Sequence, residues 1–342
     1  MPSIKAQAVR LNGGFGLDHL SFDTVDVPAP GPYEVLIRMR AVSLNYRDLL
    51  VTLGRYNPKQ PLPVILCSDG AGEVVSTGPG VTRFKPGDRV AGIFMQRWIS
   101  GERTRDAGAS ALGAALDGML VEHRVLNEEG LVSVPAHLGY EEGATLPCAA
   151  VTAWQTLVHA GRIKAGDSVL LLGTGGVSVF ALQFAHMHGA RVIVTSSSDE
   201  KLERARGLGA TDTINYKTTP DWEKEVYRLT GGRGVDLVVE VGGAGTLPKS
   251  MRAVRVSGHI GVIGNLSGLD VSMSIGLMVA NGIRLHGIYV GSRAMFEEMN
   301  RAIAAHQMRP VIHHVYPFRE SREAVAAMQK GEHFGKLVIS FD

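Results

Sequence analysis

The sequence predicts a two-domain α/β protein that combines a β-rich domain with a doubly wound parallel sheet. The length of 342 residues suits about two domains at roughly 150 residues each. Before residue 125 the chain is rich in β-branched stretches and in Pro-Gly and Gly-Asp turns, and after residue 141 strand-like and helix-like stretches alternate. Such alternation is typical of parallel βαβ units.

Composition excludes several classes of protein. Lysine and arginine number 35 against 33 aspartates and glutamates, so a net charge of +2 argues against a nucleic acid or an anionic membrane as the main partner. Two cysteines, Cys67 and Cys148, are too few for a disulfide scaffold or a four-cysteine zinc site. The first residues lack the apolar core of a signal peptide, and we therefore expect a cytoplasmic protein.

The first half of the chain predicts an antiparallel β unit. Strand-like stretches at 34–39, 72–76 and 89–93 are separated by turn sequences at 28–31, 79–80 and 86–88. Residues 96–118 look irregular, and we expect them to form an exposed lobe.

The second half alternates between the two kinds of element. Helices are expected at 142–160, 176–187, 199–208, 222–230, 295–306 and 321–330. Strands are expected at 168–172, 191–195, 212–215, 235–240, 259–263, 284–290, 311–316 and 336–341.

A glycine turn joins the apolar stretch 168–172 to the helix that follows. It reads Gly173, Thr174, Gly175, Gly176 and Val177, and Ser178 stands where the dinucleotide-binding pattern has its third glycine. Backbone N–H groups in such a turn can approach a pyrophosphate, which then lies at the positive end of the helix. The turn therefore predicts a bound dinucleotide.

The tip of the next strand favours NADP over NAD. NAD enzymes usually carry an acid there, which receives the ribose 2′-hydroxyl. In this chain Ser196 and Ser197 stand at the tip, no acid occurs before Asp199, and Lys201 is within reach of a 2′-phosphate. In an alternative interpretation Ser197 and Glu200 form a capping box on the following helix.

Several motifs together resemble the medium-chain dehydrogenase/reductase superfamily over essentially the whole chain. They are the stretches 45–48 and 70–72, the stretch 81–90 and the glycine turn. The resemblance implies a GroES-like catalytic domain of residues 1–150 and 293–342 and a Rossmann domain of residues 151–292. It also implies further cofactor contacts from Thr152, Tyr216, Gly242, Gly264, Asn265, Leu266, Ile288, Tyr289, Val290, Phe334 and Lys336. Lys336 would be a counter-charge to the pyrophosphate, or else an ordinary solvated lysine.

The same resemblance indicates that the catalytic zinc of the alcohol dehydrogenases is missing. Zinc members have a cysteine, a His-Glu pair and a second cysteine where this chain has Asn45, Ser68-Asp69 and Cys148. Amides and hydroxyls are poor zinc ligands, so we expect no metal and take Cys148 as a buried packing residue.

Without zinc, the resemblance favours the quinone oxidoreductase branch. It implies that Asn45 and Tyr56 face the substrate, with Tyr46 and Arg47 as weaker candidates and Asp48 orienting its neighbours. The alternatives are that Asn45 caps a helix, that Tyr56 packs at the edge of the β unit, and that Arg47 pairs with Asp48 or Asp69.

The expected function is zinc-independent, NADPH-dependent hydride transfer to a quinone or an α,β-unsaturated carbonyl compound. The alternatives are an NAD-dependent alcohol dehydrogenase relative and a non-catalytic, cofactor-binding member of the fold. Relatives commonly form dimers through an edge strand of the Rossmann sheet, so we expect a homodimer that uses residues 284–290.

Overall fold

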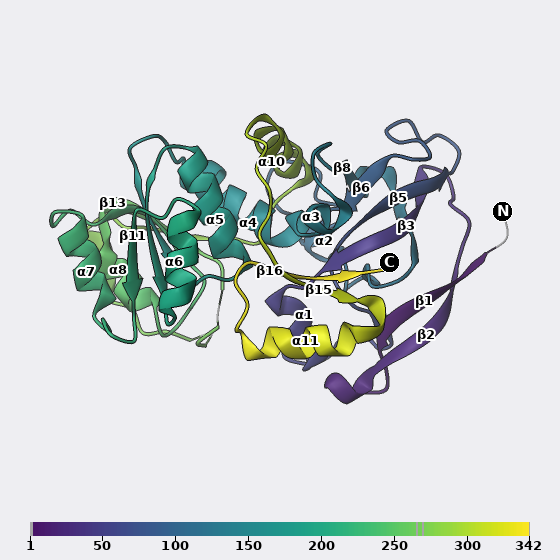
Figure 1. Cartoon of the computed structure of the whole chain (residues 1–342), viewed down its shortest axis with the longest axis horizontal. Helices are drawn as coiled ribbons and strands as arrows, with labels where there is room; N and C mark the ends of the chain where they lie inside the picture. The colour runs from purple at the N-terminus through teal and green to yellow at the C-terminus, as the bar shows by residue number, and fades with distance from the viewer. Residues whose placement is uncertain (1–2, 265, 269, 342) are drawn as a thin grey trace. The chain divides into compact units, whose positions relative to one another are not determined.

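The computed structural model describes residues 3–264, 266–268 and 270–341. It divides the chain into two compact units, a first unit of Met1–Val151 and Gly291–Asp342 and a second unit of Thr152–Val290 (Figure 1). The sheets of the first unit are mostly antiparallel, with one parallel strand pair near the C-terminus, and the second unit has a parallel sheet, so the predicted α/β fold class is confirmed. No helix of the described residues is long and apolar enough to cross a membrane.

Two sheets form the first unit. The order β2-β1-β4 builds the smaller one, and the larger runs β15-β16-β3-β5-β6-β8 with β7 paired to β3. Their strands are β1 (Ile4–Leu11), β2 (Leu20–Val27), β3 (Glu34–Ser43), β4 (Val64–Ile65), β5 (Asp69–Thr77), β6 (Arg89–Gly92), β7 (His123–Asn127), β8 (Leu131–Ser133), β15 (Ile312–Pro317) and β16 (Lys336–Ser340). Helices α1 (Tyr46–Thr52), α2 (Arg105–Gly108), α3 (Tyr140–Ala144), α10 (Arg293–Ala305) and α11 (Ser321–Lys330) belong to the same unit.

The strand register of the first unit brings three distant segments together. Ser43, the last residue of β3, is paired with Asp69 at the start of β5 and with Val338 in β16. Leu44 continues this contact, because its backbone N–H donates to Leu337 O at 3.0 Å. Residues next to these pairs, near positions 45, 69 and 336, therefore meet at one end of the sheet.

The expectation of an exposed lobe at 96–118 is confirmed for residues 100–106, which are exposed, and is wrong for most of the residues on either side of them. Trp98 and Leu112 are buried, and Leu112 belongs to the main apolar core of the first unit. The backbone N–H of Leu112 also donates to Phe94 O at 3.0 Å. Irregular backbone is compatible with burial here because apolar side chains anchor the segment and its polar groups find partners.

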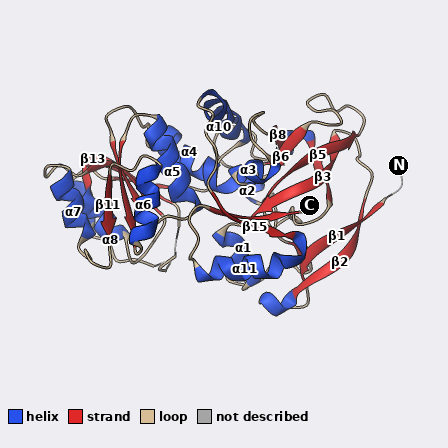
Figure 2. Ribbon diagram, in the orientation of Figure 1, coloured by secondary structure: helices blue, strands red, loops and turns tan. Residues whose placement is uncertain are grey.

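The second unit contains a parallel sheet of order β11-β10-β9-β12-β13-β14. Its strands are β9 (Ser168–Leu172), β10 (Arg191–Ser196), β11 (Asp212–Asn215), β12 (Val235–Glu240), β13 (Val254–Val262) and β14 (Arg284–Gly287). Figure 2 shows helices around this sheet, namely α5 (Gly176–Met187), α6 (Asp199–Gly207), α7 (Trp222–Leu229) and α8 (Leu247–Ala253). The short helix α9 (Ile275–Ala280) belongs to the same unit. The strand order reverses between β9 and β12, where doubly wound sheets bind ligands.

The long helix expected at 142–160 is a composite. It consists of α3, a π-helical turn at Leu146–Ala150, the short α4 (Val151–Trp154) and a second π-helical segment at Gln155–Ala160. π-Helical turns are rare in proteins, and those that do occur within helices are often found at functional sites. Cys148 and Thr152, both singled out in the sequence, lie in this segment.

Candidate active site

Four polar side chains meet inside the first unit where β3, β5 and β16 converge. We call Asn45, Ser68, Asp69 and Lys336 the polar cluster; all four are buried. Lys336 Nζ donates to Asn45 Oδ1 and to the Leu44 carbonyl oxygen, each at 2.6 Å. Ser68 Oγ donates to Asp69 Oδ1 at 2.7 Å, and Asn45 Nδ2 lies 3.5 Å from Ser68 Oγ.

Burial and charge act in opposite directions on Asp69. Loss of hydration raises the pKa of its carboxyl to about 6, although the ammonium of Lys336 and the hydrogen bond from Ser68 favour the ionised form. Asp69 Oδ2 also accepts the backbone N–H of Cys148 at 2.9 Å. Both carboxylate oxygens therefore have protein partners.

Arg47 and Asp48 lie beside the cluster, on α1. Arg47 Nη1 donates to Asp48 Oδ1 at 3.2 Å and to the Leu112 carbonyl oxygen at 2.7 Å, and Asp48 Oδ2 accepts the Asn45 backbone N–H at 2.8 Å. The guanidinium lies over the ring of Tyr56, with its carbon 4.8 Å from the ring centroid, and over Phe94 at 5.0 Å. These contacts support the ion-pair interpretation of Arg47 and also the orienting role expected of Asp48.

Tyr46 and Tyr56 differ in their surroundings. Tyr46 is exposed at the start of α1. Tyr56 is half-buried and packs against the apolar core of the first unit, below the Arg47 guanidinium. The structure thus brings Tyr56, Arg47 and Asp48 together and leaves Tyr46 on the surface.

The residues at the zinc-ligand positions do not fit a zinc ion. The Asn45 amide oxygen is engaged by an ammonium group, and the Asp69 oxygens are engaged by Ser68 and by the Cys148 backbone. Burial raises the pKa of the Cys148 thiol far above its ordinary value, which disfavours the thiolate that zinc requires. Among the described residues no group of three or more histidine, cysteine or acidic side chains could hold a metal. Cys148 was expected to be a buried packing residue, and the structure shows it half-buried.

The glycine turn of the second unit fits a pyrophosphate. Gly173 follows β9 with φ +72, a conformation that favours glycine, and its backbone N–H donates to Thr195 O at 2.9 Å. A Cβ on Gly173 or Gly175 would meet no atom within 4 Å, so the backbone faces open space. Gly176 and Val177 begin α5, a 12-residue helix whose N-terminal N–H groups are oriented toward this space, and Thr174 is buried beside them.

The tip of β10 lacks a free acid. Asp199 Oδ1 accepts a hydrogen bond from Asn215 Nδ2 at 2.8 Å, while Ser196 is buried and Ser197 and Lys201 are half-buried. The capping residue of α6 is Ser198, whose Oγ accepts the Lys201 backbone N–H at 3.3 Å. The alternative capping box from Ser197 and Glu200 is therefore wrong by one position, because Ser198 has the extended backbone that an N-cap requires.

Several other expected cofactor contacts lie at the same carboxyl edge of the sheet. Gly242 and Gly264 follow β12 and β13, Leu266 is exposed, and Tyr216 follows β11 and donates its backbone N–H to Ser196 O at 3.0 Å. Ile288, Tyr289 and Val290 follow β14, and Val290 has a φ of 59, which is strained for a β-branched residue. Thr152 is buried in the second unit, and Asn265 lies outside the described residues.

Two expected contacts are buried in the first unit. Lys336 is only 3% exposed and Phe334 is 1% exposed. Lys336 is therefore not an ordinary solvated lysine, and its ammonium binds Leu44 O and Asn45 Oδ1. A role as counter-charge to the pyrophosphate has to compete with these two hydrogen bonds.

One residue that sequence reasoning missed organises the loop after β12. Glu240 Oε1 accepts the backbone N–H groups of Gly242 at 2.8 Å and Gly243 at 3.0 Å and the hydroxyl of Thr246 at 2.6 Å. Its other oxygen accepts the Ser250 hydroxyl. An acid that directly follows the apolar residues 237–239 and ends the strand was the available signal.

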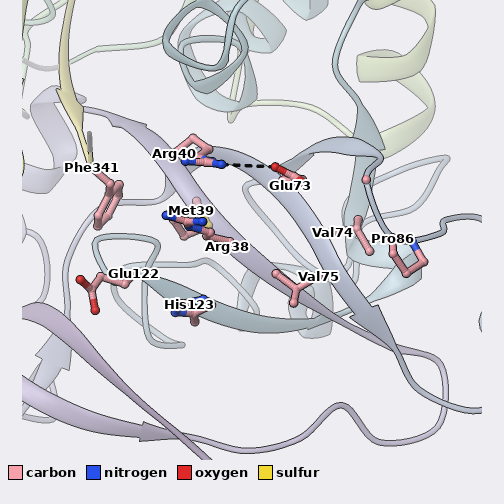
Figure 3. A pocket seen from close by; sticks show the side chains of 11 residues that line it. Arg38, Met39, Arg40, Glu73, Val74, Val75, Pro86, Glu122, His123 and Phe341 are labelled. Atoms are coloured by element: carbon pink, nitrogen blue, oxygen red, sulfur yellow. Dashed lines mark hydrogen bonds and ion pairs between the residues drawn. The ribbon is translucent and has the colours of Figure 1, made fainter.

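A separate pocket of about 550 Å³ lies in the first unit and contains none of the predicted site residues (Figure 3). Arg38, Arg40, Glu73, Glu122 and His123 supply its charged and titratable lining. Arg40 and Glu73 form an ion pair at 3.4 Å across it. Acidic and basic groups nearly balance, so the pocket shows no clear preference for a charged ligand.

Comparison with known proteins gives consistent matches over the whole chain. The model of the alcohol dehydrogenase GroES-like domain matches residues 31–136, and that of the zinc-binding dehydrogenases matches 176–305. A zinc-type alcohol dehydrogenase-like protein of Schizosaccharomyces pombe is 44% identical and covers 96% of each chain. A quinone oxidoreductase of Pseudomonas aeruginosa is 34% identical over 81% of this chain and 79% of its own. The crystal structure of a putative alcohol dehydrogenase from Sinorhizobium meliloti has a TM-score of 0.92 at 41% identity and covers 100% of both chains.

Proposed function

Because the chain belongs to the medium-chain dehydrogenase/reductase superfamily of oxidoreductases, we propose that it reduces quinones or α,β-unsaturated carbonyl compounds with NADPH and without zinc. The observation that carries the proposal is the polar cluster. At positions where zinc members of the family have metal ligands it has the Asn45 amide and the Ser68 hydroxyl, and the amide oxygen is hydrogen-bonded to the Lys336 ammonium. Hydrogen-bond donors remain to stabilise negative charge on an oxygen, and no thiolate or imidazole set remains to hold a Lewis acid.

The proposed chemistry divides between cofactor and protein. When bound, the reduced nicotinamide supplies a hydride that forms a C–H bond at the β-carbon of the acceptor. The electron pair of the carbon–carbon double bond then moves toward the carbonyl oxygen, and water supplies the proton that completes the reduction. The Asn45 amide N–H donates to that oxygen as its charge develops, and Tyr56 lines the same part of the first unit.

The preference for NADPH rests on the tip of β10. The Asp199 carboxylate is held by Asn215, and the hydroxyls of Ser196 and Ser197 precede it. A 2′-phosphate therefore meets hydroxyl donors and the Lys201 ammonium rather than an acid aimed at the ribose. We expect a higher kcat/KM with NADPH than with NADH.

The proposal includes a homodimer formed through the second unit. β14 is the last strand in the order of its sheet, and Arg284, His286 and Gly287 in it are exposed. Ile275 and Val279 in the preceding helix α9 are each 71% exposed. Unpaired strand edges and exposed apolar side chains favour association with a second copy. Light scattering after gel filtration should give a mass of two chains, and a concentration-independent mass of one chain contradicts the dimer.

The activity is tested by identifying the product from methyl vinyl ketone. A zinc-independent enone reductase should oxidise NADPH and give butanone, in which the carbon–carbon double bond is reduced. An alcohol dehydrogenase would give but-3-en-2-ol instead. NADPH binding without turnover of this ketone or of 1,4-benzoquinone would support a non-catalytic, cofactor-binding protein.

A further inference from the structure

Burial of the Lys336 ammonium is energetically unfavourable, and two short hydrogen bonds offset this cost. Lysine is almost never fully buried unless it is paired. Here Nζ has two acceptors at 2.6 Å, the Leu44 carbonyl and Asn45 Oδ1, and it lies close enough to Asp69 to act on that carboxyl electrostatically. Gly335, with φ +81, precedes it, and a Cβ there would come within 2.4 Å of Val311 O. The backbone conformation at Gly335 thus helps to place Lys336 in the polar cluster.

The contact with Lys336 decides which way the Asn45 amide points. An ammonium group has three donors and no acceptor, so only the amide oxygen can face it. The flipped amide would set an NH₂ group against the ammonium, donor against donor. The Nδ2 group must therefore point away from Lys336, toward Ser68 Oγ at 3.5 Å and toward the Asp69 carboxyl, with which the Asn45 side chain also hydrogen-bonds. An amide NH₂ group has two N–H donors and the Ser68 contact is long, so one donor remains for a substrate oxygen when the other bonds to Asp69.

We propose that Lys336 is a positioning residue, which holds the Asn45 amide so that its N–H faces the reacting oxygen of the acceptor. This inference rests on the proposed function, because it concerns the donor that the reduction needs. Without Lys336 the Leu44 carbonyl loses its partner, and the amide can flip to donate to it. The donor would then be turned away from the acceptor in part of the molecules.

The test compares steady-state kinetics of full-length variants with NADPH and methyl vinyl ketone. We expect Lys336→Met to lower kcat roughly 10- to 100-fold, as loss or misplacement of one oxyanion donor does. The NADPH Kd, measured by fluorescence, should change less than about twofold if the ammonium serves Leu44 O and Asn45 Oδ1 rather than the pyrophosphate. Asn45→Asp keeps an acceptor for Lys336 but removes the donor, and it should lose kcat at least as strongly while the protein stays folded.

A double variant separates a positioning role from an independent one. If Lys336 acts through Asn45, adding Lys336→Met to Asn45→Ala should cost less than about twofold in kcat, because the shared effect is already lost. Lys336→Gln keeps a donor for Asn45 Oδ1 without the charge, so it should retain more kcat than Lys336→Met. Where Lys336→Met does not fold, Lys336→Gln replaces it, and a smaller loss of kcat in the same direction is expected.

Two results overturn the inference. In the first, Lys336→Met raises the NADPH Kd about tenfold at unchanged kcat, which would make it a pyrophosphate counter-charge. In the second, the losses of the two single variants multiply in the double variant. A wild-type enzyme that reduces neither methyl vinyl ketone nor 1,4-benzoquinone contradicts the proposed function itself and is thereby distinguished from both.

Discussion

The contribution of Asp69 to folding stability depends on pH. Burial raises the pKa of its carboxyl in the folded state to about 6, above the ordinary value of 3.8. The folded protein therefore binds this proton more tightly than the unfolded chain, so the group favours folding below about pH 4. That contribution is lost as the pH rises toward 6, and it amounts to about 3 kcal/mol.

Asp69→Asn should remove this dependence. The free energy of unfolding of the variant, measured by urea denaturation, should rise relative to wild type by up to about 3 kcal/mol between pH 4 and pH 7. The exposed Asp26, whose side chain is 60% accessible, offers a control in Asp26→Asn. Parallel stability curves for Asp69→Asn and wild type would mean that Asp69 titrates at an ordinary pKa.

Arg47 has contacts that predict a structural effect on substitution. Arg47→Met leaves the buried Asp48 carboxylate without its ion pair and Leu112 O without a donor, so we expect a loss of about 3–5 kcal/mol and a lower Tm. Arg47→Lys keeps the charge, so its stability should lie between that of wild type and that of Arg47→Met. A Met variant with unchanged Tm and no activity would instead identify Arg47 as a substrate contact.

Residue types were more predictable than their partners. The absence of zinc-ligand side chains at positions 45 and 68 can be seen in the sequence. Lys336 and Asn45 are 291 positions apart, and only the pairing of β16 with β3 brings them into contact. For the same reason Lys336 was expected at the cofactor rather than beside Asn45.

At the scale of elements, the turn between β9 and α5 provides a matched set of glycine variants. Gly175 has φ −75 and open space around its Cβ position, so Gly175→Ala should fold normally. Its methyl group would stand where the backbone approaches the pyrophosphate, and the NADPH Kd should rise at least about tenfold.

Two further variants, Gly173→Ala and Gly207→Ala, separate backbone strain from steric interference with the pyrophosphate. Gly173→Ala, at φ +72, should also lose about 1–2 kcal/mol of stability to left-handed strain. Gly207→Ala, at the end of α6 and in open space, should leave the Kd unchanged and should not lower stability. Calorimetric titration with NADPH and thermal unfolding check all three. Equal affinity of Gly175→Ala and wild type would contradict a pyrophosphate at this turn.

The elements with clear periodicity and clear ends were predictable. β9, α5, β11, β12 and α11 begin and end at the predicted residues, since each is bounded by turn or capping residues. α8 was missed because Pro248 in its first turn looks like a break, although proline is tolerated there. The sequence predicted no bounds for β1 and β2. In the structure their buried and exposed residues alternate, as in antiparallel strands with one solvent-exposed face.

At the scale of the molecule, the fold class followed from the alternation of strands and helices, but completion of the first unit by the C-terminal segment did not. Resemblance to a family implied that segment's place, and the structure shows residues from 291 onward in the first unit. Periodicity within a segment carries no information about which distant sheet it joins. The proposed reduction without a metal depends on the C-terminal segment joining the first unit, because β16 in that segment carries Lys336.

The most direct test of that claim measures metal content and turnover on the same sample. The full-length protein is dialysed against dipicolinate, its zinc is determined by mass spectrometry, and NADPH oxidation with methyl vinyl ketone is compared before and after dialysis. We predict an unchanged kcat in protein that contains far less than one zinc per chain. A kcat that falls with the zinc content and returns when Zn²⁺ is restored would contradict the account.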